Sequence, residues 1–114
     1  MSPEHRAQRA AQRQLDAYNT GDIDAFVACY HPDVRIFDLK TGEQTMSGRE
    51  EMHNAYGPMF QKFPELNAVV TTRSVVGNVV FDREFVTGRG EPIQVMAIYE
   101  VDEHELITKV WFVR

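Results

Sequence analysis

The first thirty residues carry apolar positions at helical spacing. Over residues 3–19 an apolar stripe runs among Arg, Gln and Glu side chains, which predicts an amphipathic surface helix. Asn19-Thr20-Gly21 gives this helix a C-terminal stop, and Asp22 can cap a second short helix over residues 23–30, which His31-Pro32 ends. Two helices are therefore expected to meet at a tight corner.

A third helix is predicted after a strand and a polar loop. Ser47-Gly48-Arg49-Glu50 matches the Ser-x-x-Glu capping box, which satisfies free N–H groups at the start of a helix. Its apolar stripe is formed by Met52, Tyr56, Met59 or Phe60, and Phe63. Gly57-Pro58 is expected to kink or break this helix, because proline lacks the N–H and clashes with the preceding turn.

The second half of the chain changes to strand-like patterns. Four runs, residues 67–76, 78–87, 92–102 and 105–113, are separated by short breaks, most of them of hairpin size. Connections this short predict an antiparallel meander. Helices segregated on one face of such a sheet make an α+β domain.

The strand expected over residues 92–102 has two different faces. One face is entirely apolar, is expected to pack against the helices, and comprises Ile93, Val95, Ala97, Tyr99 and Val101. The other face holds Met96 and Ile98 with no further helix to cover them, so we expect a homodimer through the outer face of the sheet. In the last strand both alternating sets contain apolar residues, and Trp111 is expected on the inner face.

Asp38 ends a strand pattern whose earlier residues face the interior. Val34 and Ile36 share one face at period two, so Asp38 is expected to point the same way. Burying an ionised carboxylate costs several kcal/mol and raises its pKa, which suits a proton-transfer base. The alternative is that Asp38 caps the turn at residues 39–42, at the solvated end of the strand.

Composition limits the classes of function. A chain of 114 residues predicts one domain, residues 1–114, and 43% apolar with 25% charged residues is ordinary for a globular protein. The net charge of −5 argues against nucleic acid, which needs a basic face. No apolar run approaches the roughly 20 residues that span a bilayer, so we expect no membrane partner and a cytoplasmic location.

Several motifs together resemble a known family. They are the segment Ala17-Tyr18-Asn19-Thr20-Gly21-Asp22-Ile23-Asp24-Ala25-Phe26, then Pro32-Asp33-Val34, Asp38, Gly48-Arg49-Glu50, and the closing Tyr99-Glu100-Val101 and Trp111-Phe112. With this order of elements the whole chain resembles the nuclear transport factor 2-like superfamily, in its SnoaL-like and steroid delta-isomerase-like branch. The resemblance implies a cone-shaped curved antiparallel sheet, wrapped by three N-terminal helices around an internal pocket. Members include isomerases, cyclases, dehydratases, hydrolases and binding modules.

The same resemblance implies residue roles. In the ketosteroid isomerase branch an aspartate abstracts a proton, while a tyrosine and a protonated aspartic acid stabilise the oxyanion. Asp38 falls at the position of the base, whereas Gln14 and Ala97 stand at the two oxyanion positions. Loss of one such donor typically costs about two or three orders of magnitude in rate. Gln14 could still donate a hydrogen bond, and Tyr18 on the same stripe could offer a phenol.

The remaining candidates concern the lining of the pocket. Glu84 lies in a strand whose orientation the pattern leaves open; facing inward, it would be a second cavity acid coupled to Asp38. The residues expected at the pocket are Gln14, Tyr18, Phe26, Met52, Tyr56, Phe60, Glu84, Ala97, Tyr99 and Trp111. The histidines lack metal-ligand spacing and no phosphate or dinucleotide motif is present, so neither a metal nor a cofactor is expected.

Three functions are consistent with these features. The first is a cofactor-independent isomerase, lyase or hydrolase that acts on a small hydrophobic ligand with Asp38 as general base. The second is a binding protein that uses the same pocket without chemistry. The third is a dimerisation module whose interior is filled by its own side chains.

Overall fold

Three helices and six strands build the fold. The computed structural model describes residues 1–114. In chain order the elements are α1 (Pro3–Thr20), α2 (Ile23–Ala28), β1 (Tyr30–Asp38), β2 (Gln44–Ser47), α3 (Gly48–Lys62), β3 (Asn67–Val76), β4 (Val79–Thr87), β5 (Ile93–Val101) and β6 (Ile107–Val113). None of the helices is both long enough and apolar enough to cross a membrane.

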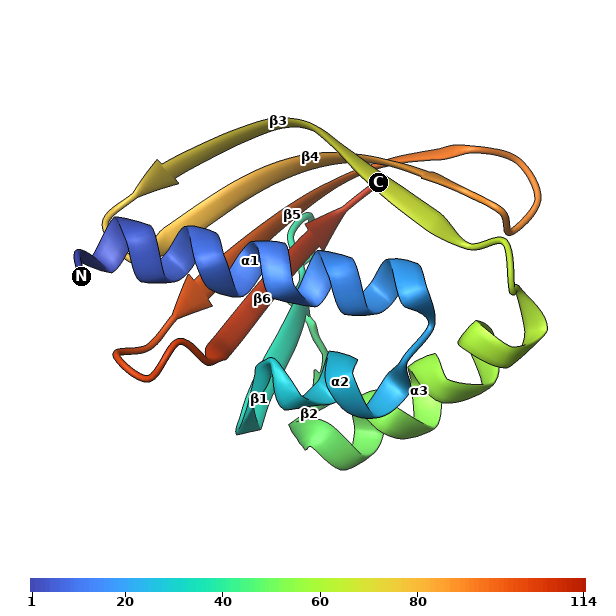
Figure 1. Ribbon diagram of the computed structural model, residues 1–114, viewed down its shortest axis with the longest axis horizontal. Helices are drawn as coiled ribbons and strands as arrows, with labels where there is room; N and C mark the ends of the chain where they lie inside the picture. Colours follow the sequence, from blue (N-terminus) through green and yellow to red (C-terminus); the bar gives the residue numbers. More distant parts are fainter.

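All six strands belong to one curved, open sheet with the order β2-β1-β6-β5-β4-β3. Neighbouring strands are antiparallel except β1 and β6, which are parallel. Helix α1 lies along the concave side of the sheet, and α2 and α3 lie on the same side, next to α1 (Figure 1). The predicted α+β class, with its curved antiparallel sheet and helices on one side, is confirmed.

The cap residues between α1 and α2 are those predicted, whereas α3 differs from its prediction at two points. Gly21 ends α1 with φ of 70°, and the Asp22 side chain accepts a hydrogen bond from the Ala25 N–H at 3.0 Å to cap α2. At α3, however, the Ser47 side chain makes no cap bond, and Glu51 rather than Glu50 accepts the Ser47 N–H. The helix also continues past the expected break at Gly57-Pro58 to Lys62.

Four register shifts interrupt the sheet, and two of them bear on predictions made from the simple alternation of the sequence. Between β5 and β6, Glu100 pairs with Lys109 while Val101 pairs with Ile107, so one residue is skipped. The bulge places Ile107 on the inner side and Trp111 on the outer side, and the prediction that Trp111 faces inward is therefore wrong. A second bulge, between β1 and β2, lies just before the turn that follows Asp38.

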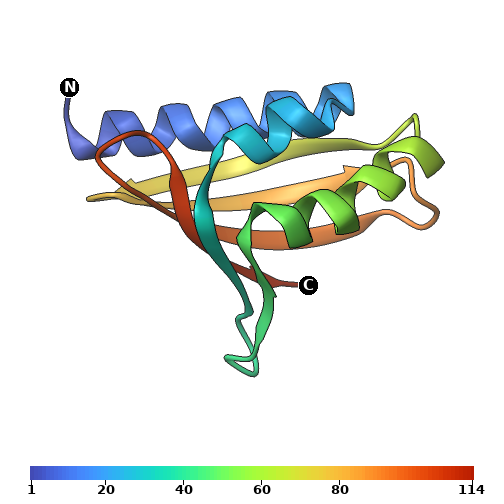
Figure 2. The ribbon, with the colours of Figure 1, turned by 90° about the horizontal axis from the view of Figure 1, so that it is seen from below.

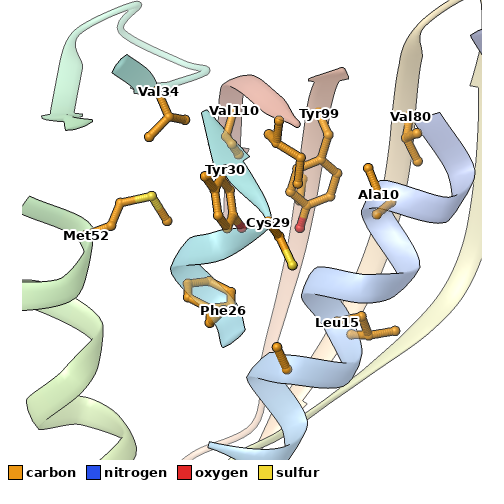
Figure 3. Packing of buried hydrophobic residues seen from close by; sticks show 14 of the residues in the cluster. Ala10, Leu15, Phe26, Cys29, Tyr30, Val34, Met52, Val80, Tyr99 and Val110 are labelled. Carbon is orange, nitrogen blue, oxygen red and sulfur yellow. The ribbon is translucent and has the colours of Figure 1, made fainter. Parts of the chain in front are cut away.

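A buried apolar cluster joins the helices to the inner face of the sheet. Ala10 and Leu15 of α1, Phe26 of α2 and Tyr99 of β5 meet in this cluster (Figure 3). The predicted inward face of β5 is confirmed, because its apolar residues are either buried or line the cavity described below. The single cysteine, Cys29, is 5% exposed and packs as a small core residue.

Candidate functional site

A cavity of about 280 Å³ lies between the helices and the inner face of the sheet. Its volume is close to the lower end of the range for small-molecule sites. Six of the residues predicted at a pocket line it: Gln14, Tyr18, Phe26, Tyr56, Glu84 and Tyr99. Twelve more line it that the sequence analysis did not assign to a pocket: Leu15, Tyr30, Met46, Ala55, Met59, Ala68, Val86, Arg89, Ile93, Val95, Phe112 and Arg114.

Four residues predicted at the pocket lie elsewhere. Met52, Phe60 and Ala97 are 1%, 6% and 0% exposed, belong to the buried apolar cluster and are not among the residues that line the cavity. Trp111 lies on the outer face, where its ring stacks on Phe37 with 5.7 Å between ring centroids. These four residues are therefore packing groups in this structure.

Asp38 also lies outside the cavity. Its Oδ1 accepts hydrogen bonds from the N–H groups of Lys40 and Thr41, at 2.9 and 3.0 Å. These bonds form the cap of a turn that projects away from the body of the molecule (Figure 2). The prediction that its carboxylate points into the interior is wrong. The end of β1 lies outside the core, and the carboxylate binds the N–H groups of the turn that follows.

The acid that does reach the cavity is Glu84. Inner positions of β4 alternate with outer ones, so Val80, Asp82, Glu84 and Val86 share the buried face. Glu84 is 8% exposed, and its Oε2 accepts a hydrogen bond from the Tyr99 hydroxyl at 3.2 Å. Its Oε1 has no protein partner, and no fully buried side-chain oxygen in the molecule is unpaired, so Oε1 is open to the cavity.

A chain of hydrogen bonds runs through the interior to Glu84. Gln14 Nε2 donates to the Ala11 carbonyl at 3.1 Å and to the Tyr99 hydroxyl at 3.0 Å. The Tyr30 hydroxyl donates to Gln14 Oε1 at 3.2 Å. Tyr30 and Tyr99 come from different strands, and their hydroxyl ends point the same way (Figure 3).

One backbone carbonyl fixes the direction of this chain. The Ala11 oxygen can only accept, so the amide nitrogen of Gln14 must face it and the amide oxygen must face Tyr30. The Tyr99 hydroxyl receives the second amide hydrogen and therefore donates its own proton to Glu84. From Tyr30 through Gln14 and Tyr99, successive donors therefore point toward the carboxylate, and the second Gln14 N–H is held by the Ala11 carbonyl.

Burial is the main cause of the raised pKa of Glu84. Loss of solvent, together with the nearby negative charge of Asp82, raises the pKa of Glu84 to about 7. The Tyr99 hydrogen bond and the charge of Arg73 lower that pKa by smaller amounts. Arg73 donates two hydrogen bonds to Asp82, at 2.7 and 2.9 Å, so its positive charge offsets part of the effect of Asp82 on Glu84.

Two further hydroxyls are available to a ligand. Tyr18 and Tyr56 line the cavity, neither hydroxyl has a hydrogen-bond partner in the protein, and neither oxygen is fully buried. Burial raises the pKa of Tyr18 to about 12 and raises the pKa of Tyr56 further. Both phenols therefore stay protonated at neutral pH and can donate a hydrogen bond.

Tyr30 is the functional-site candidate that sequence reasoning missed. The pattern placed it at the end of the second helix, whereas it opens β1 and is 1% exposed. The signal was present in His31-Pro32, because the residue before Pro32 favours extended backbone and Tyr30 could have begun the strand. Arg89 and Arg114 were missed because a loop and a chain end carry no periodicity.

Comparison with known proteins finds matches along nearly the whole chain. The model of a family described as the SnoaL-like domain matches residues 11–110. A solved structure of an uncharacterized cystatin-fold protein from Novosphingobium aromaticivorans is similar, with a TM-score of 0.84 and 26% identity over 100% of this chain and 99% of that one. A search of curated protein sequences gave no significant match.

Two other similar structures have names that suggest an activity. A protein provisionally described as a ketosteroid isomerase, from Kribbella flavida, has a TM-score of 0.81 at 21% identity, over 98% of this chain and 79% of that one. A protein provisionally described as a polyketide cyclase, from Sinorhizobium meliloti, has a TM-score of 0.77 at 19% identity, over 92% and 94% of the two chains. At these identities the likeness is one of fold.

Proposed function

This chain belongs to the SnoaL-like domain family, and we propose that its cavity binds a small, largely apolar molecule on which Glu84 transfers a proton. The family match confirms the resemblance to the nuclear transport factor 2-like superfamily. One observation carries the proposal: a buried carboxylate with one oxygen open to an apolar cavity receives the last bond of a directed donor chain.

In the proposed step, Glu84 Oε1 takes a proton from a carbon next to a ligand carbonyl, and the electron pair moves onto the carbonyl oxygen. The Tyr18 and Tyr56 hydroxyls supply hydrogen-bond donors for the enolate oxygen. In a ligand with a carbon–carbon double bond next to that carbon, the product is a dienolate. Glu84 then returns the proton to the far carbon of the dienolate, which moves the double bond and isomerises the ligand. A pKa of about 7 suits both halves of this cycle, because the two protonation states are populated near neutral pH.

Glu84 replaces Asp38 as the base in this proposal for a geometric reason. A general base must come within hydrogen-bond reach of the proton it removes. Asp38 is committed to a projecting turn and is not part of the cavity lining, whereas Glu84 faces the cavity. The implied role of Asp38 as a base stays a prediction of the family resemblance.

Hydrogen–deuterium exchange tests the proposed step without knowledge of the product. Small cyclic ketones and enones are incubated with the protein in D₂O, and deuterium at carbons next to the carbonyl is measured by mass spectrometry. We expect the wild type to accelerate exchange, Glu84→Gln to lose roughly a hundredfold or more of that acceleration, and Asp38→Asn to retain it. Equal rates for Glu84→Gln and wild type would contradict the role of Glu84.

A second function, ligand binding without chemistry, is favoured by a different observation. The two positions that hold oxyanion donors in the ketosteroid isomerase branch are Gln14 and Ala97 here, and Gln14 is already fully engaged within the protein. A binding protein would be stabilised by its ligand through mass action in wild type and Glu84→Gln alike, with no deuterium exchange in either.

We also propose that the chain forms a homodimer through the outer face of the sheet. Phe81, Ile98, Trp111 and Phe37 lie opposite one another across four neighbouring strands of that face. Phe81 is 37% exposed, and no helix covers this side of the sheet (Figure 2). An apolar row of this kind is typical of an interaction surface.

A further inference from the structure

Two arginines line the cavity in a chain whose net charge is −5. Arg89 lies in the connection between β4 and β5, and Arg114 follows β6. Neither guanidinium lies within 4.0 Å of a carboxylate, although three arginine–carboxylate pairs of this kind exist elsewhere in the molecule. Two cations without counterions therefore face the same cavity as Glu84.

From this arrangement we propose that the ligand carries a carboxylate, which Arg89 and Arg114 bind at the solvent-facing end of the cavity while the apolar body extends toward Glu84. The inference rests on the proposed function, because it specifies the ligand of the same site. Arg114 is exposed and Arg89 is half-buried, so this end of the cavity is accessible from solvent. Guanidinium groups pair with carboxylates through strong, charge-assisted hydrogen bonds.

The surroundings of Arg89 hold its side chain in place. The preceding residue, Gly88, has φ of 90°, and a Cβ there would lie 2.1 Å from the backbone oxygen of Glu65. This glycine lets the β4–β5 connection pack tightly against the segment after α3. The Arg89 guanidinium lies 6.0 Å from the ring centroid of Phe63, and its Nη1 lies 3.5 Å from the Met59 sulfur. Arg89 is therefore directed toward the cavity wall rather than free in solvent.

The register of β6 directs Arg114 to the same cavity. Phe112 pairs with Ala97 of β5 and lines the cavity, and Val113 is the next residue. Successive side chains alternate along an extended strand, so Arg114, two residues after Phe112, returns to the inner side. Arg114 is accordingly among the lining residues.

The charges divide the cavity into two ends. Arg89 and Arg114 both lower the pKa of Tyr18, so their fields reach the interior, whereas Arg73 is the arginine that lowers the pKa of Glu84. Along β4, Glu84 lies three positions before Thr87, the last residue of the strand, a distance of roughly 10 Å. A ligand of that length can place its anion at the arginines and a reacting carbon at Glu84.

The charge count favours a singly charged anion. Glu84 is the one acidic side chain among the lining residues, against two arginines. With Glu84 ionised, the side chains of the lining carry a net charge of +1, which a single carboxylate neutralises. A ligand with this anion would also be attracted to the positive end of the cavity despite the negative charge of the whole chain.

A matched pair of probes tests the proposal. Naphthalene-2-carboxylate and its neutral amide have the same ring and nearly the same shape, and their binding is measured by isothermal titration calorimetry at pH 6. Wild type is compared with Arg89→Gln, Arg114→Gln and the double variant. The control is Arg83→Gln, which removes an equal charge from an exposed arginine that bonds to Gln94 on the outer face.

We expect wild type and Arg83→Gln to bind the acid roughly tenfold more tightly than the amide, and each cavity variant to lose most of that preference. The double variant should bind acid and amide equally while its thermal unfolding stays cooperative. If the wild type binds both probes with equal affinity, the carboxylate proposal is wrong and the cavity-binding function stands. If the wild type binds neither probe, the carboxylate proposal and the cavity-binding function are both overturned.

Discussion

Glu84 and Asp38 show how much the surroundings of a carboxylate matter. Both lie on strands at positions whose neighbours two residues away face the core. Asp38 finds two backbone N–H donors in the turn that follows, whereas Glu84 sits under α1 with a tyrosine hydroxyl and another acid nearby. Strand period fixes the face of a residue, but the partners of its side chain come from segments distant in sequence.

The raised pKa of Glu84 predicts a pH-dependent effect on stability. The carboxyl titrates near 4.5 in the unfolded chain and near 7 in the folded protein, so the folded state binds the proton more tightly. Stability is therefore highest with Glu84 protonated and is lost as the pH rises from about 4.5 through 7. Glu84→Gln should raise the free energy of unfolding at pH 8 by on the order of 2 kcal/mol.

Urea unfolding of wild type and Glu84→Gln at pH 5 and pH 8 checks this sign. The advantage of the variant should shrink toward pH 5, where the wild-type carboxyl is protonated in the folded state. A variant less stable than wild type at pH 8 would show that the ionised carboxylate is stabilising, contrary to the burial described here.

Substitution of Asp38 should affect its turn and not the cavity. Asp38→Ala removes the acceptor of two backbone N–H groups, and we expect a loss of about 1 kcal/mol in the free energy of unfolding. Asp38→Asn keeps an oxygen in the same place and should cost less. Both changes are measured by urea unfolding together with binding of naphthalene-2-carboxamide. Loss of binding in Asp38→Asn at unchanged stability would place Asp38 in the site after all.

At the scale of elements, the sequence predicted most helices and strands because their periods are regular. Three helices and the strands β3 to β6 were expected within a few residues of their observed bounds. The short strand β2 was read as a loop, since four exposed or half-buried residues carry no alternation. The bulge in β6 was also invisible to periodicity, because both of its alternating sets contain apolar residues. That bulge is what exchanged the sides of Trp111 and Phe112.

Asn19 links α1 to β3, two elements that no sequence pattern predicted to be joined. Its side-chain amide donates to the Ala68 carbonyl at 2.9 Å and accepts the Ala68 N–H at 2.7 Å, which ties the end of α1 to β3. Asn19→Ala leaves both backbone groups without this partner, and we expect a loss of about 2 kcal/mol in the free energy of unfolding.

Asn54→Ala is the matched control for this prediction. Asn54 is exposed on α3, so its replacement should change the free energy of unfolding by no more than about 0.5 kcal/mol. Urea unfolding of the two variants should give clearly separated midpoints. Equal midpoints would mean that the Asn19 bridge contributes little to holding α1 on the sheet.

At the scale of the whole molecule, the uncovered face of the sheet predicts the state of assembly. Ile98 lies at the centre of the apolar row, between Phe81 on β4 and Trp111 on β6. Sedimentation velocity should give twice the monomer mass of 13.1 kDa for wild type. Ile98→Glu places a charge in the row and should yield monomers with an unchanged fold. A monomeric wild type would refute the proposed interface.

The cavity itself is a property of the whole molecule, and the sequence predicted only part of its lining. Tyr18, Phe26 and Tyr56 were placed correctly because they lie on helix stripes that face the sheet. Met52 and Phe60 lie on the same stripe as Tyr56, yet they pack into the core. The curvature of the sheet and the positions of α2 and α3 decide which side chains fill space and which enclose it, and no local pattern encodes that.

The most direct test of the account is the pKa of Glu84 in the folded protein. It can be measured from the pH dependence of the side-chain carboxyl ¹³C resonance, assigned by its loss in Glu84→Gln. The account predicts a midpoint of about 7, as expected for a buried acid beside Asp82 that is poised to exchange protons in the cavity. A midpoint near 4.5, the ordinary value, would mean that the carboxylate is solvated and would contradict its assignment as the proton-transfer group.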